Sequence, residues 1–351
     1  MKKILKSIGI MSLLLLTVVP AKAAVTYTVI DLGNFSIRAI NNRGEVVGWL
    51  TTPSQETHAA YYSNGVLNDL GTLGGTYSSA WDINDYGHIV GTSIMTDGSY
   101  HAFLFSDGIM NDLGTFGGIS SYAAGINNSG QIAASYDITN EASHAIRYDH
   151  GSIFEIGNLG GTYAIATGIN SLGDIIGHAD NANGADRAFV YSNGEITDIG
   201  TLGETTFPLD INDAGQIVGA SWTWSSFGDH AFLYENGTIS DINGFCSSSL
   251  ATSINNNGEI VGTGYPTIGA FIFRDGNMNQ LNDLIDPASD ITLTGAQSIN
   301  DNGQIVAYGQ YGNNEQSVFL LTPIPEPSIF LQLCIALAGM FICIWRHKRP
   351  S

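Results

Sequence analysis

Four histidines occupy the same place in an internal repeat and raise the possibility of a metal site. They are His58, His101, His144 and His230. A transition-metal ion needs three or four ligands that converge on it, with histidine nitrogens at about 2.0–2.1 Å. Equivalent positions in successive copies of a repeat lie one copy apart, so these side chains cannot converge. We therefore expect structural histidines that bond loop carbonyls, and we predict no metal site.

Two further patterns resemble ligand-binding loops. Asp82–Gly87 and Asp210–Gly215 contain Asn-Asp-x-Gly turns, but they lack the alternating acids and the distal glutamate of an EF-hand loop. Turn chemistry accounts for them, with weak calcium binding left open. Gly71–Gly75 has no following Lys-Ser/Thr, which argues against a phosphate loop and favours a connection between structural units.

The pattern most typical of a binding site is Trp222 and Trp224, followed by Phe227. In an extended chain the side chains of residues i and i+2 point the same way, so two indoles here could stack on sugar rings. Packing within a loop is the alternative, because aromatic pairs often pack together. We predict Trp222, Trp224 and Phe227 as ligand-binding residues. No catalytic motif or cofactor motif occurs, so we expect neither an enzyme nor a cofactor.

The charge distribution excludes several classes of partner. The 351-residue chain has a formal net charge of −20. Between residues 24 and 325 it carries five arginines, no lysine and 31 acidic residues. This balance excludes nucleic-acid binding through phosphate contacts and docking on anionic lipid. Cys246 is the single cysteine of that part, so no disulfide can form within it.

The N-terminus has the pattern of a secretory signal peptide, residues 1–23. Three lysines precede an apolar run of about 12 residues, which is shorter than a membrane span of about 20. Ala21 and Ala23 form a small-x-small cleavage site, and we predict that signal peptidase cuts before Ala24.

The C-terminus has three ordered features. Pro325, Glu326 and Pro327 lie in a short segment, 323–328, which is followed by an apolar run, 329–345, and a basic tail, 346–351. The run of 17 residues is at the short edge of the length that spans a membrane, and we expect it to span with the basic tail on the cytoplasmic side. This arrangement resembles the PEP-CTERM sorting signal of Gram-negative bacteria. The resemblance implies processing near the motif by an exosortase, and a link to exopolysaccharide and biofilm matrix.

The middle of the chain consists of seven copies of one unit. The string Ile-Asn-x-x-Gly recurs at a spacing of 42–45 residues. Its seven asparagines are Asn41, Asn84, Asn127, Asn170, Asn212, Asn255 and Asn300. In each unit a turn at this asparagine joins two short strands, and in six units a second turn, such as Asp107-Gly108, predicts another hairpin.

A unit of about 43 residues that forms four antiparallel strands is typical of one blade of a β-propeller. The seventh copy stops after its third strand, Ser317–Leu321, while an unpaired fourth strand, Tyr27–Gly33, opens the mature chain. We therefore predict an all-β, seven-bladed propeller over residues 24–322, closed by pairing of these two strands. A β-solenoid is the alternative, but it does not explain the divided fourth strand.

The units also resemble the HAF family of bacterial extracellular repeats, named for His-Ala-Phe. The motif appears as His101–Phe103 and His230–Phe232, with looser copies elsewhere, and Asp69–Gly75 carries the companion Asp-Leu-Gly-Thr-Leu-Gly-Gly. The resemblance covers about residues 27–321 and implies an exported repeat protein without implying an activity.

These patterns together predict an exported, exosortase-processed propeller of the cell surface or matrix. It would bind exopolysaccharide or a surface partner through its loops, and touch the membrane only through its C-terminal helix. An extracellular polysaccharide lyase or glycoside hydrolase, with acids at the channel mouth, is the alternative, and a purely structural matrix component is a third possibility.

Overall fold

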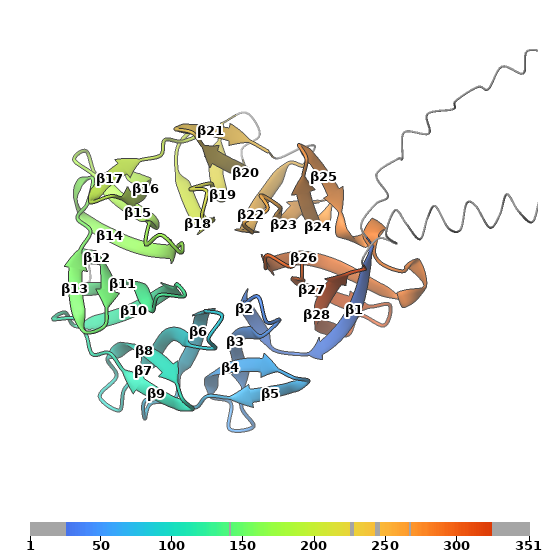
Figure 1. Ribbon diagram of the computed structural model, residues 1–351, viewed down its shortest axis with the longest axis horizontal. Coiled ribbons are helices and arrows are strands. Elements are labelled where there is room, and N and C mark those ends of the chain that lie inside the picture. The colour runs from blue at the N-terminus through green and yellow to red at the C-terminus, as the bar shows by residue number, and fades with distance from the viewer. Residues whose placement is uncertain (1–25, 140–141, 225–227, 243–245, 267, 325–351) are drawn as a thin grey trace, which may run out of the picture. The chain divides into compact units, whose positions relative to one another are not determined.

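The computed structural model describes residues 26–139, 142–224, 228–242, 246–266 and 268–324. Within these ranges the chain forms seven four-stranded antiparallel sheets arranged around a central opening (Figure 1). The innermost strand of each sheet, called strand a below, lies nearest the opening, and strands b, c and d follow outward. The predicted seven-bladed propeller is confirmed.

Each blade uses one copy of the repeat. Blade 1 contains β2 (Ser36–Ile40), β3 (Val46–Thr51), β4 (Thr57–Ser63) and β5 (Val66–Asp69). Blade 2 contains β6 (Ser78–Ile83), β7 (Ile89–Ile94), β8 (Tyr100–Ser106) and β9 (Ile109–Asp112). Blade 3 contains β10 (Ser120–Ile126), β11 (Gln131–Thr139), β12 (Ala142–Asp149) and β13 (Ser152–Glu155). Blade 4 contains β14 (Gly160–Ile169), β15 (Ile175–Asn181), β16 (Asp186–Ser192) and β17 (Glu195–Asp198).

Blades 5 to 7 follow the same order. Blade 5 contains β18 (Thr206–Ile211), β19 (Ile217–Thr223), β20 (Gly228–Glu235) and β21 (Thr238–Asp241). Blade 6 contains β22 (Ser248–Ile254), β23 (Ile260–Tyr265), β24 (Gly269–Arg274) and β25 (Asn277–Gln280). Two 3-10 helices, Leu281–Leu284 and Pro287–Ser289, precede blade 7, which contains β26 (Ile291–Ile299), β27 (Ile305–Tyr311), β28 (Gln316–Pro323) and β1 (Tyr27–Gly33).

The two ends of the repeat region meet in blade 7. Strand β1 pairs antiparallel with β28, in a register that places Val29 opposite Leu321. Because the first strand completes the last sheet, the ring of blades has no open end that could pair with another chain. The predicted closure is confirmed.

The repeat asparagine forms the turn between strands a and b. In blade 3 the N–H of Gly130 donates to the carbonyl of Asn127 at 3.0 Å, and Gly130 has a φ of +79°. The turn between strands c and d has two residues with positive φ, such as Asp107 and Gly108. Both turns are the hairpin types that the sequence predicts.

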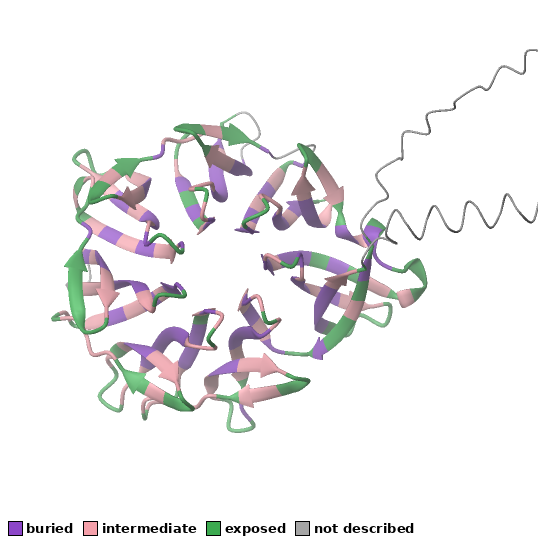
Figure 2. Ribbon diagram, viewed as in Figure 1, coloured by how far each residue is buried: buried purple, intermediate pink, exposed green. Residues whose placement is uncertain are grey.

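The hydrophobic core lies between neighbouring blades. One cluster combines Val90 and Ala102 of blade 2 with Ile126, Ile132 and Ile146 of blade 3. Another joins Val306 of blade 7 to Val46 of blade 1 and completes the ring. Figure 2 shows buried residues on the inner and middle strands and more exposed residues on the outer ones. The inner and middle strands therefore need apolar side chains on both faces, as the sequence indicates, whereas outer strands such as β13 are largely exposed.

Small residues in strand b have a different role from the one expected. We expect glycines such as Gly91 to allow adjacent sheets to approach. Instead, a Cβ at Gly91 would lie 2.0 Å from the carbonyl oxygen of Ser79 and 2.8 Å from the Phe103 ring, both in the same blade. The glycine makes room for strand a and for the strand-c phenylalanine within one sheet.

Several predictions concern residues outside the described ranges. These are the signal peptide with Ala21, Ala23 and Ala24, the motif Pro325–Pro327 and the apolar run 329–345. Within the ranges that the structure describes, no helix has the length and apolar character needed to cross a membrane.

Candidate functional site: the channel wall

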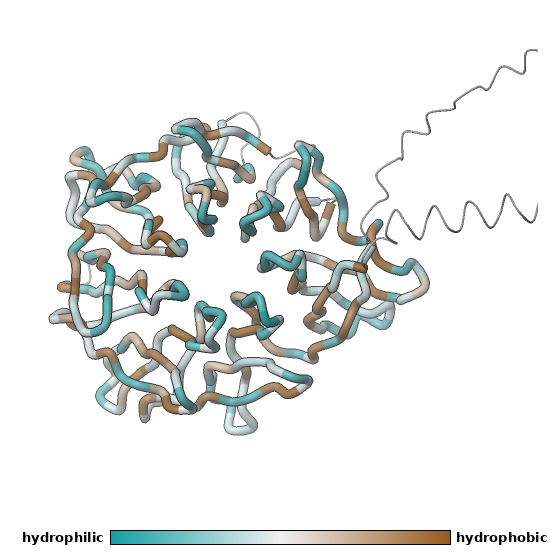
Figure 3. The backbone as a smooth tube through the Cα atoms, viewed as in Figure 1, coloured by the Kyte–Doolittle hydropathy of each residue, from teal (hydrophilic) through white to brown (hydrophobic). Residues whose placement is uncertain are grey.

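A cavity of about 920 Å³ occupies the middle of the ring and is lined by residues of all seven blades. Its volume is in the range of small-molecule binding sites. Figure 3 shows hydrophilic turns at the tips that point toward the centre. The cavity wall therefore combines polar turn residues, such as Asn84 and Asp85, with apolar residues, such as Ile83 and Leu209.

A β-bulge in every strand a determines which side chains line this cavity. In blade 2, Ala80 pairs with Gly91 and Asp82 pairs with Val90, which leaves Trp81 unpaired. A bulge re-aims side chains, and here the unpaired residue and the one after it line the cavity in most blades. The seven unpaired residues are Arg38, Trp81, Ala124, Thr167, Leu209, Thr252 and Gln297. All of them line the cavity, and we call them the bulge ring.

The bulge ring contains one charged side chain, Arg38. Its guanidinium carbon lies 4.2 Å from the ring centroid of Trp81 and 5.2 Å from that of Trp49. Such cation–π contacts stabilise a partly desolvated cation. Burial lowers the pKa of Arg38, and its Nε is buried without a hydrogen-bond partner.

Two carboxyl groups follow the bulge, in blades 2 and 5. Asp82 accepts the N–H of Ile126 in the next blade at 2.8 Å, and Asp210 accepts the N–H of Ile254 at 2.9 Å. Burial raises the pKa of Asp82 to about 7, although its hydrogen bonds with backbone N–H groups lower the pKa. The negative charge of Asp210 raises it further. Burial likewise raises the pKa of Asp210 to about 6. Both groups therefore combine a link between blades with a protonation change near neutral pH.

The a–b turns form a closed ring of hydrogen bonds at one end of the channel. Each repeat asparagine donates its Nδ2 to the carbonyl oxygen of the repeat asparagine in the next blade, and Asn300 of blade 7 donates to Asn41 of blade 1 at 2.8 Å. The other six bonds are 3.0–3.2 Å long. These side chains are buried, so the ring satisfies polar groups that water cannot reach.

The residues after the repeat asparagines interact around the same end. Asp85 accepts hydrogen bonds from the Asn42 N–H at 2.9 Å and from the Asn128 Nδ2 at 2.9 Å. Burial favours a higher pKa for Asp85, but these hydrogen bonds outweigh it and the pKa is lowered. The carboxyl oxygens of Asp85 thus bond the neighbouring blades, a role that goes beyond the local turn chemistry expected from the sequence.

The tryptophans predicted to bind a ligand lie away from the channel wall. Trp222 is half-buried in β19 and Trp224 is 60% exposed just after it, while Phe227 lies outside the described residues. The Trp222 N–H donates to Thr205 in the d–a loop at 2.9 Å. The end of β19 therefore lies beside the d–a loop that precedes β18, but Trp222 and Trp224 are not among the residues lining the cavity.

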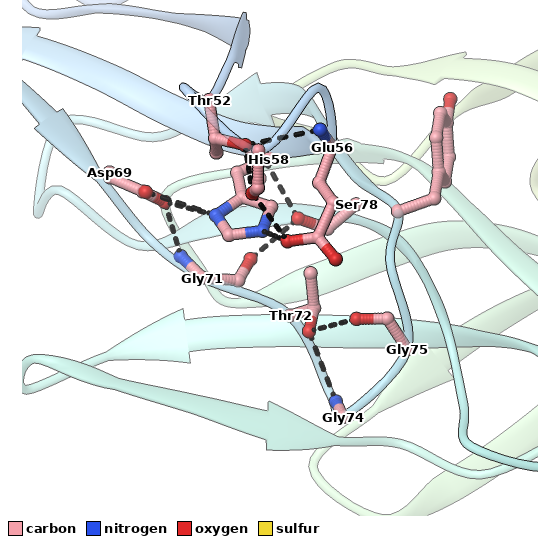
Figure 4. A network of polar contacts seen from close by, with 12 residues as sticks. Thr52, Glu56, His58, Asp69, Gly71, Thr72, Gly74, Gly75 and Ser78 are labelled. Carbon is pink, nitrogen blue, oxygen red and sulfur yellow. Dashed lines mark hydrogen bonds and ion pairs between the residues drawn. The ribbon is translucent and has the colours of Figure 1, made fainter.

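The repeat histidines contact carboxylates, which corrects the expected loop-carbonyl contact. Nδ1 of His58 lies 2.9 Å from Asp69 (Figure 4), that of His101 lies 2.8 Å from Asp112, and that of His230 lies 2.7 Å from Asp241. His144 has the weaker counterpart Glu155, at 3.4 Å. The pairing joins strand c to the end of strand d, because the His-Ala-Phe and Asp-Leu-Gly motifs lie side by side.

The same carboxylate also orders the connection to the next blade. Asp69 accepts the N–H of Gly71 at 2.7 Å, and the Gly71 carbonyl accepts the Ser78 hydroxyl at 2.5 Å (Figure 4). The Ser78 Oγ accepts the N–H of Ala59 at 2.7 Å. The glycine-rich stretch is thus a connection between blades, as predicted, and the motif residues hold it in place.

Sequence reasoning missed the bulge ring. A signal was present, because the position three residues before each repeat asparagine holds six residue types, while the position just before it is mostly alanine and the residue just before the asparagine is always isoleucine. That position holds arginine, tryptophan, alanine, threonine, leucine, threonine and glutamine in turn. Variation at one fixed place in a regular frame is typical of a surface free from packing constraints, and such a surface can evolve to bind.

Comparisons with known proteins give a likeness of fold. No family model matches the sequence, and no curated protein matches it. Among solved structures, YCF48 bound to D1 peptide is 11% identical, with a TM-score of 0.47 over 86% of this chain and 96% of that chain. A mutant Aleuria aurantia lectin in complex with Fucα1-6GlcNAc is 12% identical, with a TM-score of 0.42 over 86% and 100%.

TolB from Acinetobacter baumannii is 13% identical, with a TM-score of 0.43 over 61% of this chain. The chain spans 52% of the length of that TolB. At this level of similarity, the comparisons carry no conclusion about activity or ligand.

Proposed function

We propose that this chain is an exported β-propeller of the cell surface or matrix that binds exopolysaccharide or a surface partner and is not an enzyme. Signal peptidase removes residues 1–23, and an exosortase processes the protein near Pro325–Pro327 after transfer across the inner membrane of a Gram-negative bacterium. The motif order at both ends of the chain supports export. Intact mass of the exported protein tests it, because retention of residues 328–351 contradicts the processing.

The observation that carries the binding proposal is the exposed Trp224. An indole that is 60% exposed, just after a strand end that a main-chain hydrogen bond between Trp222 and Thr205 holds in place, offers a flat apolar surface. We call the surface around Trp222 and Trp224 the loop face. Sugar rings present similar flat apolar faces, and the central part has too much negative charge to bind a polyanion over a broad surface.

A paired substitution tests the loop face. Trp224→Ala should weaken binding to neutral exopolysaccharide of the producing organism by about tenfold, equivalent to about 1.4 kcal/mol, without lowering the stability of the fold. Trp222→Ala removes a half-buried side chain, so it should lower stability as well. Pull-down and calorimetry measure the affinity of each variant for the exopolysaccharide. Full binding by Trp224→Ala excludes the loop face as the binding site.

A second candidate function is polysaccharide cleavage in the channel. Arg38, Asp82 and Asp210 bring three ionisable groups from blades 1, 2 and 5 to one cavity, and a carboxyl with a raised pKa can act as a general acid. Incubation of the protein with polysaccharide, followed by product analysis, tests this candidate. Cleavage that is lost in Asp82→Asn supports the enzyme, whereas intact polysaccharide favours the binding protein.

A further inference from the structure

The arginine of the bulge ring lacks a partner for its charge. Among the described residues, arginine ion pairs are formed by Arg43, Arg187 and Arg274. Arg38 forms none, and its buried Nε has no hydrogen-bond acceptor. Arg38 is also the only arginine or lysine among the residues that line the cavity. A partly desolvated cation without a counterion is unusual in a folded protein, where buried charges are normally paired.

Arg38 lines the cavity, but its Nε is buried, so a ligand there would meet the terminal Nη groups of the guanidinium. Trp49 and Trp81 contact the guanidinium through their rings, and an indole ring is not an acceptor for a fork of N–H groups. A planar guanidinium matches the two oxygens of a carboxylate, with which it forms paired hydrogen bonds. The missing partner therefore has the chemistry of an oxyanion, such as a carboxylate.

The rest of the wall is suited to a hydroxylated ring. Trp81 is 36% exposed beside the guanidinium and can contact the apolar face of a ring bound there. Asp82 follows it in sequence and can accept a hydrogen bond from a sugar hydroxyl, while Gln297 brings an uncharged hydrogen-bonding group to the same cavity.

The electrostatics favour one carboxylate over many. Asp85 is engaged by Asn42 and Asn128 at the turn end of the channel, and Asp137 accepts the hydroxyl of Tyr122 at 3.0 Å. These acids still repel a polyanion, whereas a single carboxylate at Arg38 meets the one cation of the wall.

We propose that the part of the channel wall formed by blades 1 and 2 binds a hexuronic acid residue at the end of a glycan chain. Arg38 forms an ion pair with the sugar carboxylate, Trp81 contacts the sugar ring, and Asp82 accepts a hydrogen bond from a sugar hydroxyl group. This site is separate from the loop face that contains Trp224, so either can fail without the other.

The test compares two probes on the full-length chain in detergent. One is a trisaccharide with a terminal glucuronate, and the other is the same trisaccharide ending in glucose. By calorimetry the acidic probe should bind about tenfold more tightly or better, because a charge-assisted hydrogen-bond pair forms with one and not with the other. Equal affinities, or no binding of the acidic probe, overturn the proposal.

Matched arginine variants show which residue causes the tighter binding of the acidic probe. Arg38→Gln should abolish it, and Arg38→Lys should keep only part of it because lysine lacks the planar fork. Arg147→Gln is the control, because Arg147 also has a buried Nε without a partner and contacts Phe154 at 5.0 Å, but does not line the cavity. Loss of the preference in Arg147→Gln to the same extent contradicts the assignment.

A chemical measurement makes the test independent of whether the variants fold. Phenylglyoxal modifies accessible arginines, and peptide mass spectrometry reports the rate at each one. The acidic probe should slow modification of Arg38 and leave Arg43, whose side chain is 54% exposed, unchanged. The neutral probe should protect neither. Absence of protection at Arg38 overturns the proposal.

Discussion

The turn end of the channel and its wall differ in how constant their residues are among the seven blades, although both are built from strand a. At the turn end all seven blades place an asparagine, and its amide bonds the backbone of the next blade. Three residues earlier in the sequence, at the bulge ring, the seven blades have six different residue types. The first region uses the same side chain in every blade to bond backbone groups. The second region mixes two threonines that also bond the next blade, Thr167 to the Pro208 carbonyl and Thr252 to the Ala296 carbonyl, with side chains of other chemistry, such as that of Arg38.

This difference shows how a repeat can stay regular and still carry a particular site. A buried asparagine between two blades can be replaced only at the cost of several unsatisfied polar groups. A bulge residue lies outside the strand pairing, and among the described residues of the bulge ring a side-chain bond to the next blade is formed only by Thr167 and Thr252. Arg38, Trp81 and Gln297 can therefore differ without changing the blade.

The largest predicted effect is the loss of one member of the asparagine ring. Asn127 accepts the N–H groups of Ser129 and Gln131, and its Nδ2 donates to the carbonyl of Asn170. Asn127→Ala should lower the free energy of unfolding by about 3 kcal/mol, because buried groups lose their partners. Urea unfolding measures this change.

The matched control is Asn181, in the turn between β15 and β16. It accepts the N–H groups of Asn183 and Ala185 in the same local pattern, but it is not a member of the ring. Asn181→Ala should cost about 1 kcal/mol. Equal costs for the two substitutions would show that the bonds between blades add nothing.

The second prediction contrasts a wall carboxyl with a turn carboxyl through their pH dependence. The pKa of Asp82 is raised to about 7, so between about pH 4 and pH 7 the folded state holds more protons than the unfolded state. This group therefore makes the free energy of unfolding decrease as pH rises, by up to about 1.4 kcal/mol per pH unit. Asp82→Asn should remove that decrease.

Asp85 should behave in the opposite direction. Its pKa is lowered in the folded state, so its stabilising contribution is present above the unfolded pKa of about 3.9 and is lost as pH falls through the folded value. Chemical unfolding over a pH series, with Asp82→Asn and Asp85→Asn compared, measures both signs. The same slope change in both variants would remove the distinction between wall and turn.

The smallest predicted effect comes from the bulge ring itself. Gln297 lies in the cavity wall and takes no part in the pairing of strand a. Gln297→Ala should therefore change the free energy of unfolding by less than about 0.5 kcal/mol. A loss as large as that of Asn127→Ala would show that the variable positions also support the fold.

Much of the fold could be predicted because its signals are local. Asn127 and Gly130 specify a turn through their own hydrogen bonds and positive φ, and the missing fourth strand of the last copy specifies closure by Tyr27–Gly33. The histidine partners were wrong in the prediction. Asp69 and His58 become neighbours only when strands c and d pair, a contact that depends on register.

The channel site could not be predicted in the same way. Arg38 and Trp81 are 43 residues apart in sequence, and Trp49 reaches the same guanidinium from strand b. Their contact depends on the unpaired bulge residue in two separate sheets and on the angle between those sheets. The tryptophans chosen from sequence, Trp222 and Trp224, lie on the loop face.

The amino-acid sequence by itself determined the repeat, the hairpins, the number of blades and the way the ring closes, because each follows from turn residues and counting along the chain. Only the tertiary structure decided which side chains meet across blades: the closed ring of asparagine amides, the two carboxyls with raised pKa, and the unpaired arginine between indoles. These depend on distances between segments far apart in sequence, and such distances exist only after the sheets have packed around the channel.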